Sequence, residues 1–313
     1  MNTESKPLRW IEQHATLNYR IGDIQVGSIE VPVRTPVNYF WELEGTVNLE
    51  SLVAEPGRGI LLRSLPVGDA LPRIATRRGA IQYSPKSYWR FLADLNLTAE
   101  KYLSGMSGKS RSTLKRKVRK FEESFGPGID FREYRSEQDV GPYFDAARQV
   151  SSVTYQERLL GFGLPDSPEF IAGTQASARE GNWRGYVLFA RATPIAYVHC
   201  PLINGVAIYA YVGFNPKYAD ASPGTVLQWL FMQRMFVDPA IQWFDFTEGE
   251  GPHKEFFSTH KWRCADVWLL RPTLWNWLLI LTHAALDAVG VAVGRVLERV
   301  DLKRRLRLLL RRQ

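Results

Sequence analysis

The sequence is poor in the residues that build disulfide frameworks and metal sites. It contains only two cysteines, Cys200 and Cys264, which are too few for a disulfide framework and typical of buried thiols in a reducing compartment. His253 and His260 have no cysteine or carboxylate at ligand spacing, so we predict no metal. The first ten residues, MNTESKPLRW, lack the apolar run of a secretory signal. We therefore expect a cytoplasmic protein.

Acidic residues are also in the minority. The 40 Lys and Arg residues outnumber the 32 Asp and Glu residues, which gives a net charge of +8. A positive field favours acidic partners such as phosphorylated small molecules, nucleic acid or an anionic membrane. Apolar residues make up 45% of the 313 residues, as in a globular protein with a real core. This length allows one large domain or two packed lobes.

The most informative stretch lies between Ala207 and Lys254. Its first part, Ala207 to Phe214, is apolar and aromatic and ends at Asn215-Pro216, which predicts a buried strand. Ser222-Pro223 suits a helix start, and the apolar residues that follow predict a helix to Phe236, before a strand from Ile241 to Phe246. The first amides of such a helix, those of Gly224, Thr225 and Val226, are expected to be free and to favour an anion.

The remaining chain divides by composition. Residues 1–96 read as short strands punctuated by proline. The segment KSRSTLKRKVRK, residues 109–120, continues as a helix with Leu114, Val118 and Phe121 on one face and positive charge elsewhere. It is a solvated surface helix, or it grips the phosphates of a ligand or of nucleic acid. From Ile129 the pattern is strand, two helices and three antiparallel strands, with Asn204-Gly205 as a hairpin turn.

Four sequence pieces together carry a resemblance to a known family. They are KSRSTLKRKVRK, GNWRGYVLFARATPIAYVH, SPGTVL and DFTEGEGPHKEFF. In this order they resemble the GNAT superfamily of acyltransferases, in its CelD-like or FemAB-like branch. The resemblance implies a mixed α/β (α+β) class with the acyl-CoA N-acyltransferase fold over residues 97–271. Residues 1–96 would form a β-rich lobe, with a degenerate GNAT half as one interpretation, and residues 272–313 a helical tail.

The chain departs from the family pattern at three points. His253 stands where the family usually has tyrosine, and Glu248 replaces a common arginine. The glycine-rich pyrophosphate signature is reduced to Gly224. These differences bear on how coenzyme A is held and on the identity of the donor.

The candidate site residues fall into two groups. For proton transfer and charge stabilisation, the resemblance implies Asp245 and Lys254, which stand at the family's positions. Glu248, His253 and Tyr211 are further candidates, because a carboxylate, an imidazole or a phenol can move a proton there. For holding acetyl-CoA or another acyl-CoA, we expect the strand edge and the helix start, at Tyr209, Val212, Gly213, Ser222, Gly224, Thr225 and Val226.

The C-terminal tail changes composition after Arg271-Pro272. The stretch from Leu274 to Gly294 is strongly apolar, and Arg295 to Arg312 is basic and amphipathic. The apolar part is long enough to cross a bilayer, although Asp287 disfavours insertion. It lies on an anionic membrane with Trp275 near the headgroups, or it packs on the protein's own core or on a partner. We favour peripheral attachment to the inner face of the membrane or to a polysaccharide-synthesis complex.

These patterns and the resemblance predict an enzyme, a cytoplasmic-side N-acyltransferase. It would move an acetyl or acyl group from acyl-CoA to an amino or hydroxyl group of a small-molecule or sugar-linked acceptor in polysaccharide or cell-envelope biosynthesis. Two alternatives remain open. One is a FemAB-like transferase that uses aminoacyl-tRNA, the one reading in which nucleic acid is a partner. The other is a catalytically degenerate assembly factor at the membrane.

Overall fold

The structure, a computed structural model, describes residues 8–299 except 23, 44–46, 53, 55–56, 70, 127 and 155–162. The chain forms two compact units, one from residues 1–88 with 262–313 and the other from residues 89–261. We call the first the N-terminal unit and the second the central unit. The predicted division at residues 96 and 271 stays a prediction.

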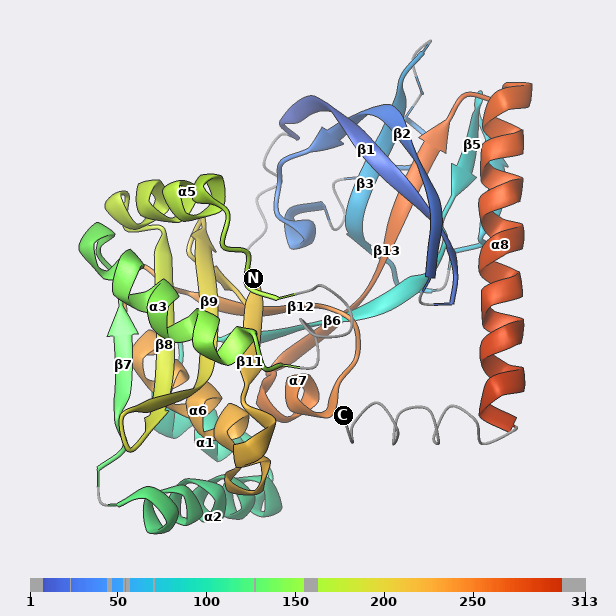
Figure 1. The fold of residues 1–313 in the computed structure, drawn as a ribbon. Coiled ribbons are helices and arrows are strands. Elements are labelled where there is room, and N and C mark those ends of the chain that lie inside the picture. Colours follow the sequence, from blue (N-terminus) through green and yellow to red (C-terminus); the bar gives the residue numbers. More distant parts are fainter. Residues whose placement is uncertain are drawn as a thin grey trace. The chain divides into compact units, whose positions relative to one another are not determined.

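The N-terminal unit is a β-sheet with one long helix (Figure 1). Its strands pair in the order β1-β2-β3-β13, and β5 pairs with both β13 and β4. Strand β1 is an antiparallel partner of β2 throughout its length. The elements are β1 (Trp10–Ile21), β2 (Ile24–Pro36), η1 (Phe40–Leu43), β3 (Gly59–Pro66), β4 (Ile74–Arg77), β5 (Ala80–Tyr83), β13 (His260–Leu270) and α8 (Leu274–Arg299).

The central unit is a mixed sheet between two groups of helices (Figure 1). Its strands pair in the order β6-β12-β10-β9-β8-β7, and β11 is a further partner of β9. Only the pair β10–β12 is parallel, and the other neighbours are antiparallel. The strands are β6 (Ser87–Asp94), β7 (Phe131–Tyr134), β8 (Trp183–Ala190), β9 (Thr193–Ile203), β10 (Val206–Ile208), β11 (Tyr211–Phe214) and β12 (Trp243–Glu248).

Each face of this central sheet has its own hydrophobic core. One core contains residues of α1, α2 and α6, and the other contains residues of α3 and α5. The helical elements are α1 (Ala99–Gly105), α2 (Gly108–Phe125), η2 (Glu137–Asp139), α3 (Val140–Ser151), α5 (Pro168–Arg179), η3 (Pro216–Ala221), α6 (Pro223–Met235) and α7 (Pro252–Phe257). In β8, Tyr186 and Leu188 enter the α6 core while Val187 and Phe189 enter the α3 core, as the two-residue period of a strand requires.

The predicted mixed α/β class and fold are confirmed, with local differences. The segment Ala207 to Phe214, predicted as one strand, is divided into β10 and β11. The first of the two helices predicted after Ile129 consists of η2 and α3, which ends at Ser151. The sequence analysis also missed β1 as a separate strand. Ala15, Leu17 and Tyr19 are buried at alternate positions there, and this period of two was visible in the sequence.

Candidate functional site

The division between β10 and β11 creates a fork in the central sheet. Strand β10 pairs with β9 on one side and with β12 on the other, up to the parallel partners Ile208 and Asp245. The amide of Tyr209 then donates to the Asp245 carbonyl at 2.9 Å, and that of Ala210 turns back to the Ile208 carbonyl. Beyond this point β11 pairs with β9, the one partner it has among the described strands. We call this divergence of β11 from β12, at Tyr209 and Asp245, the strand fork.

Asp245 is fully buried beside the strand fork and is bound to an arginine of β6. The Arg90 Nη2 and Nε atoms lie 2.6 and 3.0 Å from Asp245 Oδ2. The other oxygen, Oδ1, accepts the Thr247 amide at 2.7 Å. Both oxygens therefore accept hydrogen bonds from nitrogen donors, and the carboxylate holds Arg90 and the Thr247 amide in place.

Lys254 fastens the turn that follows β12. Its Nζ atom donates to the Glu248 carbonyl at 2.6 Å and to the Thr247 carbonyl at 3.4 Å. Burial is the main reason that the pKa of Lys254 is lowered. The charge of Arg90 lowers it further, against the opposing charges of Asp245 and Glu248. The turn itself needs left-handed backbone at Thr247 and Gly249, with φ values of 63° and 92°, and the lysine stabilises this conformation.

His253 lies on α7 with its ring 6.1 Å from the ring of Tyr209, between centroids. The side chain is exposed, yet surrounding protein and then the charge of Lys254 lower its pKa below the usual value. His253 is therefore neutral at physiological pH and can accept a proton. Burial raises the pKa of Tyr209, so that phenol stays protonated. The exposed Glu248 side chain belongs to the same turn.

The other predicted residues of β11 have different surroundings. Tyr211 packs against Phe170 and His199, with centroid distances of 5.5 and 5.8 Å. Val212 packs at the margin of the α6 core. A Cβ atom on Gly213 would lie 2.7 Å from the Thr154 Cγ2 atom, so glycine is needed there for close packing. The structure therefore brings Tyr209, but not Tyr211, into contact with the ring of His253.

The start of α6, residues Ser222–Val226, follows β11 through η3. Ser222 adopts the left-handed conformation with φ 54° and ψ 47°, and its side chain makes no capping hydrogen bond. The amides of Thr225 and Val226 donate to the Ser222 carbonyl at 3.0 and 3.1 Å. The expectation that these two amides are free is therefore wrong, because the carbonyl of an N-cap residue accepts the first hydrogen bonds of its helix. Of the three amides that were expected to bind an anion, only that of Gly224 remains available to a ligand.

Two lysines of α2, which the sequence analysis did not assign to this place, reach the start of α6. Lys117 Nζ donates to Thr225 Oγ1 at 3.0 Å, and Lys120 Nζ donates to the Asp220 carbonyl at 2.8 Å. Desolvation and then the charge of Arg116 lower the pKa of Lys117. The signal for Lys117 was its position three residues after Leu114 and four before Phe121, on the apolar side of the helix. A lysine and a helix start together favour a phosphate.

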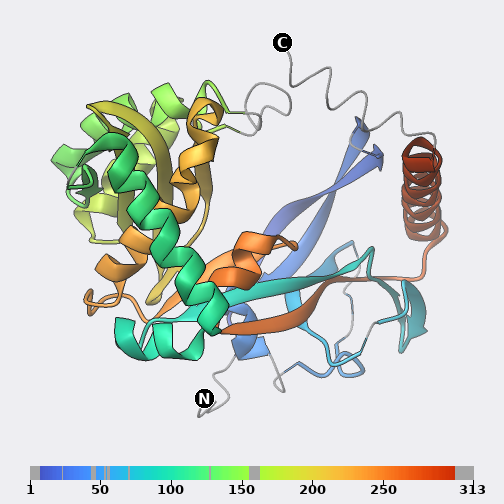
Figure 2. The ribbon, with the colours of Figure 1, turned by 90° about the horizontal axis from the view of Figure 1, so that it is seen from below.

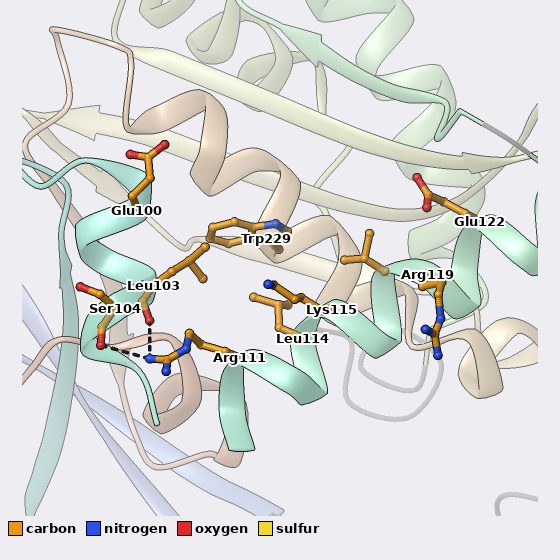
Figure 3. Close-up of a pocket in the computed structure, with 10 residues that line it drawn as sticks. Glu100, Leu103, Ser104, Arg111, Leu114, Lys115, Arg119, Glu122 and Trp229 are labelled. Atoms are coloured by element: carbon orange, nitrogen blue, oxygen red, sulfur yellow. Dashed lines mark hydrogen bonds between the residues drawn. The ribbon is translucent and has the colours of Figure 1, made fainter. Parts of the chain in front are cut away.

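A separate groove lies between α1, α2 and α6 (Figure 3). Its volume is about 720 Å³, and Leu103, Leu114, Val118 and Trp229 form its apolar lining. The Arg111 side chain points to the end of α1, where its Nη1 atom donates to the Met106 carbonyl at 2.6 Å. None of the predicted site residues lines this groove.

A family model and one solved structure support the fold, and two further structures show a lower similarity. Residues 108–255 match the family model described as an acetyltransferase (GNAT) domain. The C-terminal domain (DUF2156) of a protein from Agrobacterium fabrum is 12% identical, with 88% of this chain and 85% of that chain covered and a TM-score of 0.53. L-PGS from Bacillus licheniformis is 14% identical, with coverages of 88% and 85% and a TM-score of 0.48. FemX is 9% identical, with coverages of 86% and 90% and a TM-score of 0.49.

No curated protein sequence matches the chain. The matched segment runs from the first turn of α2 into α7, so it contains Lys117, the start of α6, the strand fork and His253. Residues 108–255 of this protein therefore match the acetyltransferase (GNAT) domain, and the fold of the chain is the GNAT fold.

Proposed function

We propose that the protein transfers an acetyl or other acyl group from acyl-CoA to an amino group, at a site between the start of α6 and the strand fork. The observation that carries this proposal is the divergence of β11 from β12 directly before the lysine-flanked start of α6. A thioester donor with a pyrophosphate needs both an extended surface for its arm and a cationic place for its phosphates.

In this proposal the start of α6 holds the pyrophosphate. The Gly224 amide donates to it, and Lys117 and Lys120 supply positive charge from α2. Phe214, whose ring would lie 3.6 Å from a Cβ atom on Gly224, packs close to this turn. The edge of β11 away from β9, with the backbone of Val212, offers hydrogen bonds to the amides of the donor's arm.

His253 is the group of this chain that we assign to proton transfer. The lone pair of the acceptor nitrogen forms the new C–N bond, and the C–S bond breaks with its electron pair on sulfur. The proton lost by nitrogen passes to the neutral imidazole of His253, and the sulfur leaves as a thiol after protonation by water. Burial raises the pKa of Tyr209, so its phenol keeps its proton and donates a hydrogen bond to the leaving sulfur.

Asp245 and Lys254 act as positioning residues in this scheme. Asp245 fixes Arg90 and the Thr247 amide, and Lys254 closes the turn that carries His253. Glu248, at the exposed end of β12, adds negative charge next to the site and so favours a cationic acceptor such as an ammonium group. We extend the proposal to amino groups of sugars or sugar-linked molecules in envelope or polysaccharide synthesis, on the sequence resemblance alone.

Titration calorimetry of acetyl-CoA and a screen for thiol release over amino-sugar and small-amine acceptors test this proposal. We expect binding of acetyl-CoA to the wild type, and thiol release that requires an amine and falls in a His253→Asn variant. Absence of acyl-CoA binding would contradict the proposal and favour an assembly role without catalysis.

A second donor is favoured by one specific feature, the cationic outer face of α2. Lys115, Arg116 and Arg119, with Gly108, Arg111 and Ser112, line a shallow depression of about 540 Å³. A polyanionic donor such as aminoacyl-tRNA would contact this face as well as the start of α6. Under that alternative, transfer RNA binds more tightly than acetyl-CoA, and Lys115→Ala with Arg119→Ala weakens RNA binding but not acetyl-CoA binding.

A further inference from the structure

Helix α8 has an apolar face that the rest of its unit leaves uncovered. The helix runs along the side of the N-terminal unit, and Figure 2 views it nearly along its axis. Exposed residues recur every three or four positions from its first turn. The stripe consists of Leu274, Trp275, Leu278, Leu281, Thr282, Ala285, Ala288, Val289 and Ala292, and Val291 and Val293 at the end of the helix are exposed as well. This stripe carries no charge, and at 1.5 Å per residue it extends for about 27 Å.

The opposite face of α8 packs on the sheet of its own unit. Leu279 and Ile280 are buried in a core with Leu17 and Tyr19 of β1. The Tyr19 hydroxyl donates to the Leu279 carbonyl at 3.1 Å. A Cβ atom on Gly290 would lie 2.5 Å from the Gly22 nitrogen, so glycine allows the helix to approach the end of β1 closely. One side of α8 is thus fixed to protein while the other is open.

Two titratable residues of the apolar tail, His283 and Asp287, bind groups of the N-terminal unit. His283 donates through Nε2 to the Asn18 carbonyl at 3.1 Å and accepts the Tyr83 hydroxyl at Nδ1, at 2.6 Å. Asp287 pairs with Arg73 Nη2 at 2.7 Å. Asp287, the residue that disfavours membrane insertion, therefore pairs with Arg73 of its own unit. The stripe of exposed residues contains no ionised group.

We propose that this α8 face, the stripe from Leu274 to Ala292, docks on the surface of an anionic lipid bilayer, with the helix axis in the membrane plane. The length and hydropathy of Leu274–Val293 would permit a crossing helix. The contacts with β1 instead favour a helix that lies flat, since they cover one side of it with protein.

Charge complementarity selects an anionic lipid as the occupant. The sequence after α8, VDLKRRLRLLLRRQ, contains Lys303, Arg304, Arg305 and Arg307 and two further arginines near the end. Basic residues next to a membrane-surface helix add binding energy on anionic lipid and add little on a zwitterionic bilayer. Trp275, 63% exposed near the start of the stripe, is a side chain suited to the headgroup region.

Vesicle co-sedimentation of the full chain tests this proposal. We expect binding to vesicles of equal parts phosphatidylcholine and phosphatidylglycerol, and weaker binding to phosphatidylcholine alone. Leu278 and Leu281 are 53% and 52% exposed, so Leu278→Glu with Leu281→Glu should leave the melting temperature unchanged. The same pair should lower the vesicle partition coefficient by roughly tenfold or more.

A matched control and two further variants make the outcome decisive. Val237, 79% exposed in the central unit, is the control, and Val237→Glu should bind vesicles as the wild type does. A variant that combines Lys303→Gln, Arg304→Gln, Arg305→Gln and Arg307→Gln should bind both kinds of vesicle equally, without the preference for phosphatidylglycerol. If the double glutamate variant fails to fold, Leu278→Ala with Leu281→Ala should still reduce binding.

Three results would overturn the membrane proposal. The wild type binds neither kind of vesicle, or the glutamate and alanine variants bind as the wild type does. In the third, the wild type binds no vesicles and forms a concentration-dependent dimer, and the double glutamate variant is a monomer. That result would mean that a second copy of the chain covers the stripe. Acetyl-CoA binding by calorimetry is a separate readout, so failure of this proposal leaves the proposed transferase function untouched.

Discussion

Two aspartates of the central unit are buried against arginines, and the proposed function assigns only one of them, Asp245, to the site. Asp238, after α6, binds Arg184 and Arg135 through Oδ2 at 2.7 Å each, and its Oδ1 accepts the Ala240 amide at 3.1 Å. Asp245 binds Arg90 and the Thr247 amide. Asp238 ties strands and a helix end together, whereas Asp245 supports a turn that carries Lys254 and His253.

The comparison shows that burial and pairing alone do not identify a functional carboxylate. Burial by itself would raise the pKa of Asp238, but hydrogen bonds from Arg184 and the Ala240 amide and the charges of Arg184 and Arg135 lower it overall. What distinguishes Asp245 is its place at the strand fork, where its carbonyl accepts the amide of Tyr209, the residue whose ring lies near His253. A functional role for a buried aspartate–arginine pair therefore depends on which neighbouring residues the pair positions.

The largest effects should come from removing either carboxylate. Asp245→Asn and Asp238→Asn each remove a buried carboxylate charge that is paired with arginine, so each should lower the free energy of unfolding by about 3–5 kcal/mol. Only Asp245→Asn should also lower kcat per folded molecule. Denaturant unfolding and thiol-release assays on the same samples measure both quantities. Equal loss of kcat in the two variants would remove the distinction between them.

A pH series sharpens the same comparison through linkage. The folded pKa of Asp238 is lower than its unfolded value, so its stabilising effect is present above the unfolded pKa. It is lost as pH falls through the folded pKa. The difference in the free energy of unfolding between the wild type and Asp238→Asn should therefore become smaller as the pH falls. A constant difference at all pH values would contradict this linkage.

Replacing His253 should affect catalysis and leave stability unchanged. His253→Asn should lower kcat by roughly 10²–10⁴-fold, the usual contribution of a general base. Because desolvation and Lys254 lower the pKa of His253, the acidic limb of the wild-type rate profile should lie below the usual histidine value. His199 is the control, because burial lowers its pKa to about 3. His199→Asn should change stability and leave the position of that limb unchanged.

Removal of the Lys117 ammonium should have a moderate effect on donor binding. Lys117→Ala should weaken acetyl-CoA binding by roughly 10–100-fold, the range expected for one charge-assisted hydrogen bond. Lys109→Ala, an exposed lysine on the first turn of α2, removes the same charge elsewhere on the helix and should change binding little. Calorimetry in low and high salt would measure both variants.

The smallest effect should follow from a methyl group on β11. Gly213→Ala places a Cβ atom 2.7 Å from Thr154 Cγ2 and 2.8 Å from Tyr197 Cε1, which should cost about 1–3 kcal/mol of stability by overpacking. Gly224→Ala meets only Phe214 at 3.6 Å, so it should fold normally. A lower melting temperature for Gly224→Ala than for Gly213→Ala would contradict the packing described for these strands.

Local features of the fold were predictable from the sequence, and long-range pairs were not. The hairpin at Asn204-Gly205 has φ values of 50° and 79°, as that dipeptide predicts. The helix start at Ser222-Pro223 also follows from local chemistry. The Arg90–Asp245 pair joins residues 155 positions apart and Lys117–Thr225 joins residues 108 apart. No local pattern announces such pairs, so the site's ion pair and its phosphate lysine required the three-dimensional structure.

The most direct test of the account is calorimetric titration of acetyl-CoA into the wild type and into Lys117→Ala, with Lys109→Ala as the control. The account predicts that acetyl-CoA binds the wild type and the control with similar affinity and binds Lys117→Ala far more weakly, at equal melting temperatures. Equal affinity in all three proteins, or no binding to the wild type, would contradict an acyl-CoA site at the start of α6.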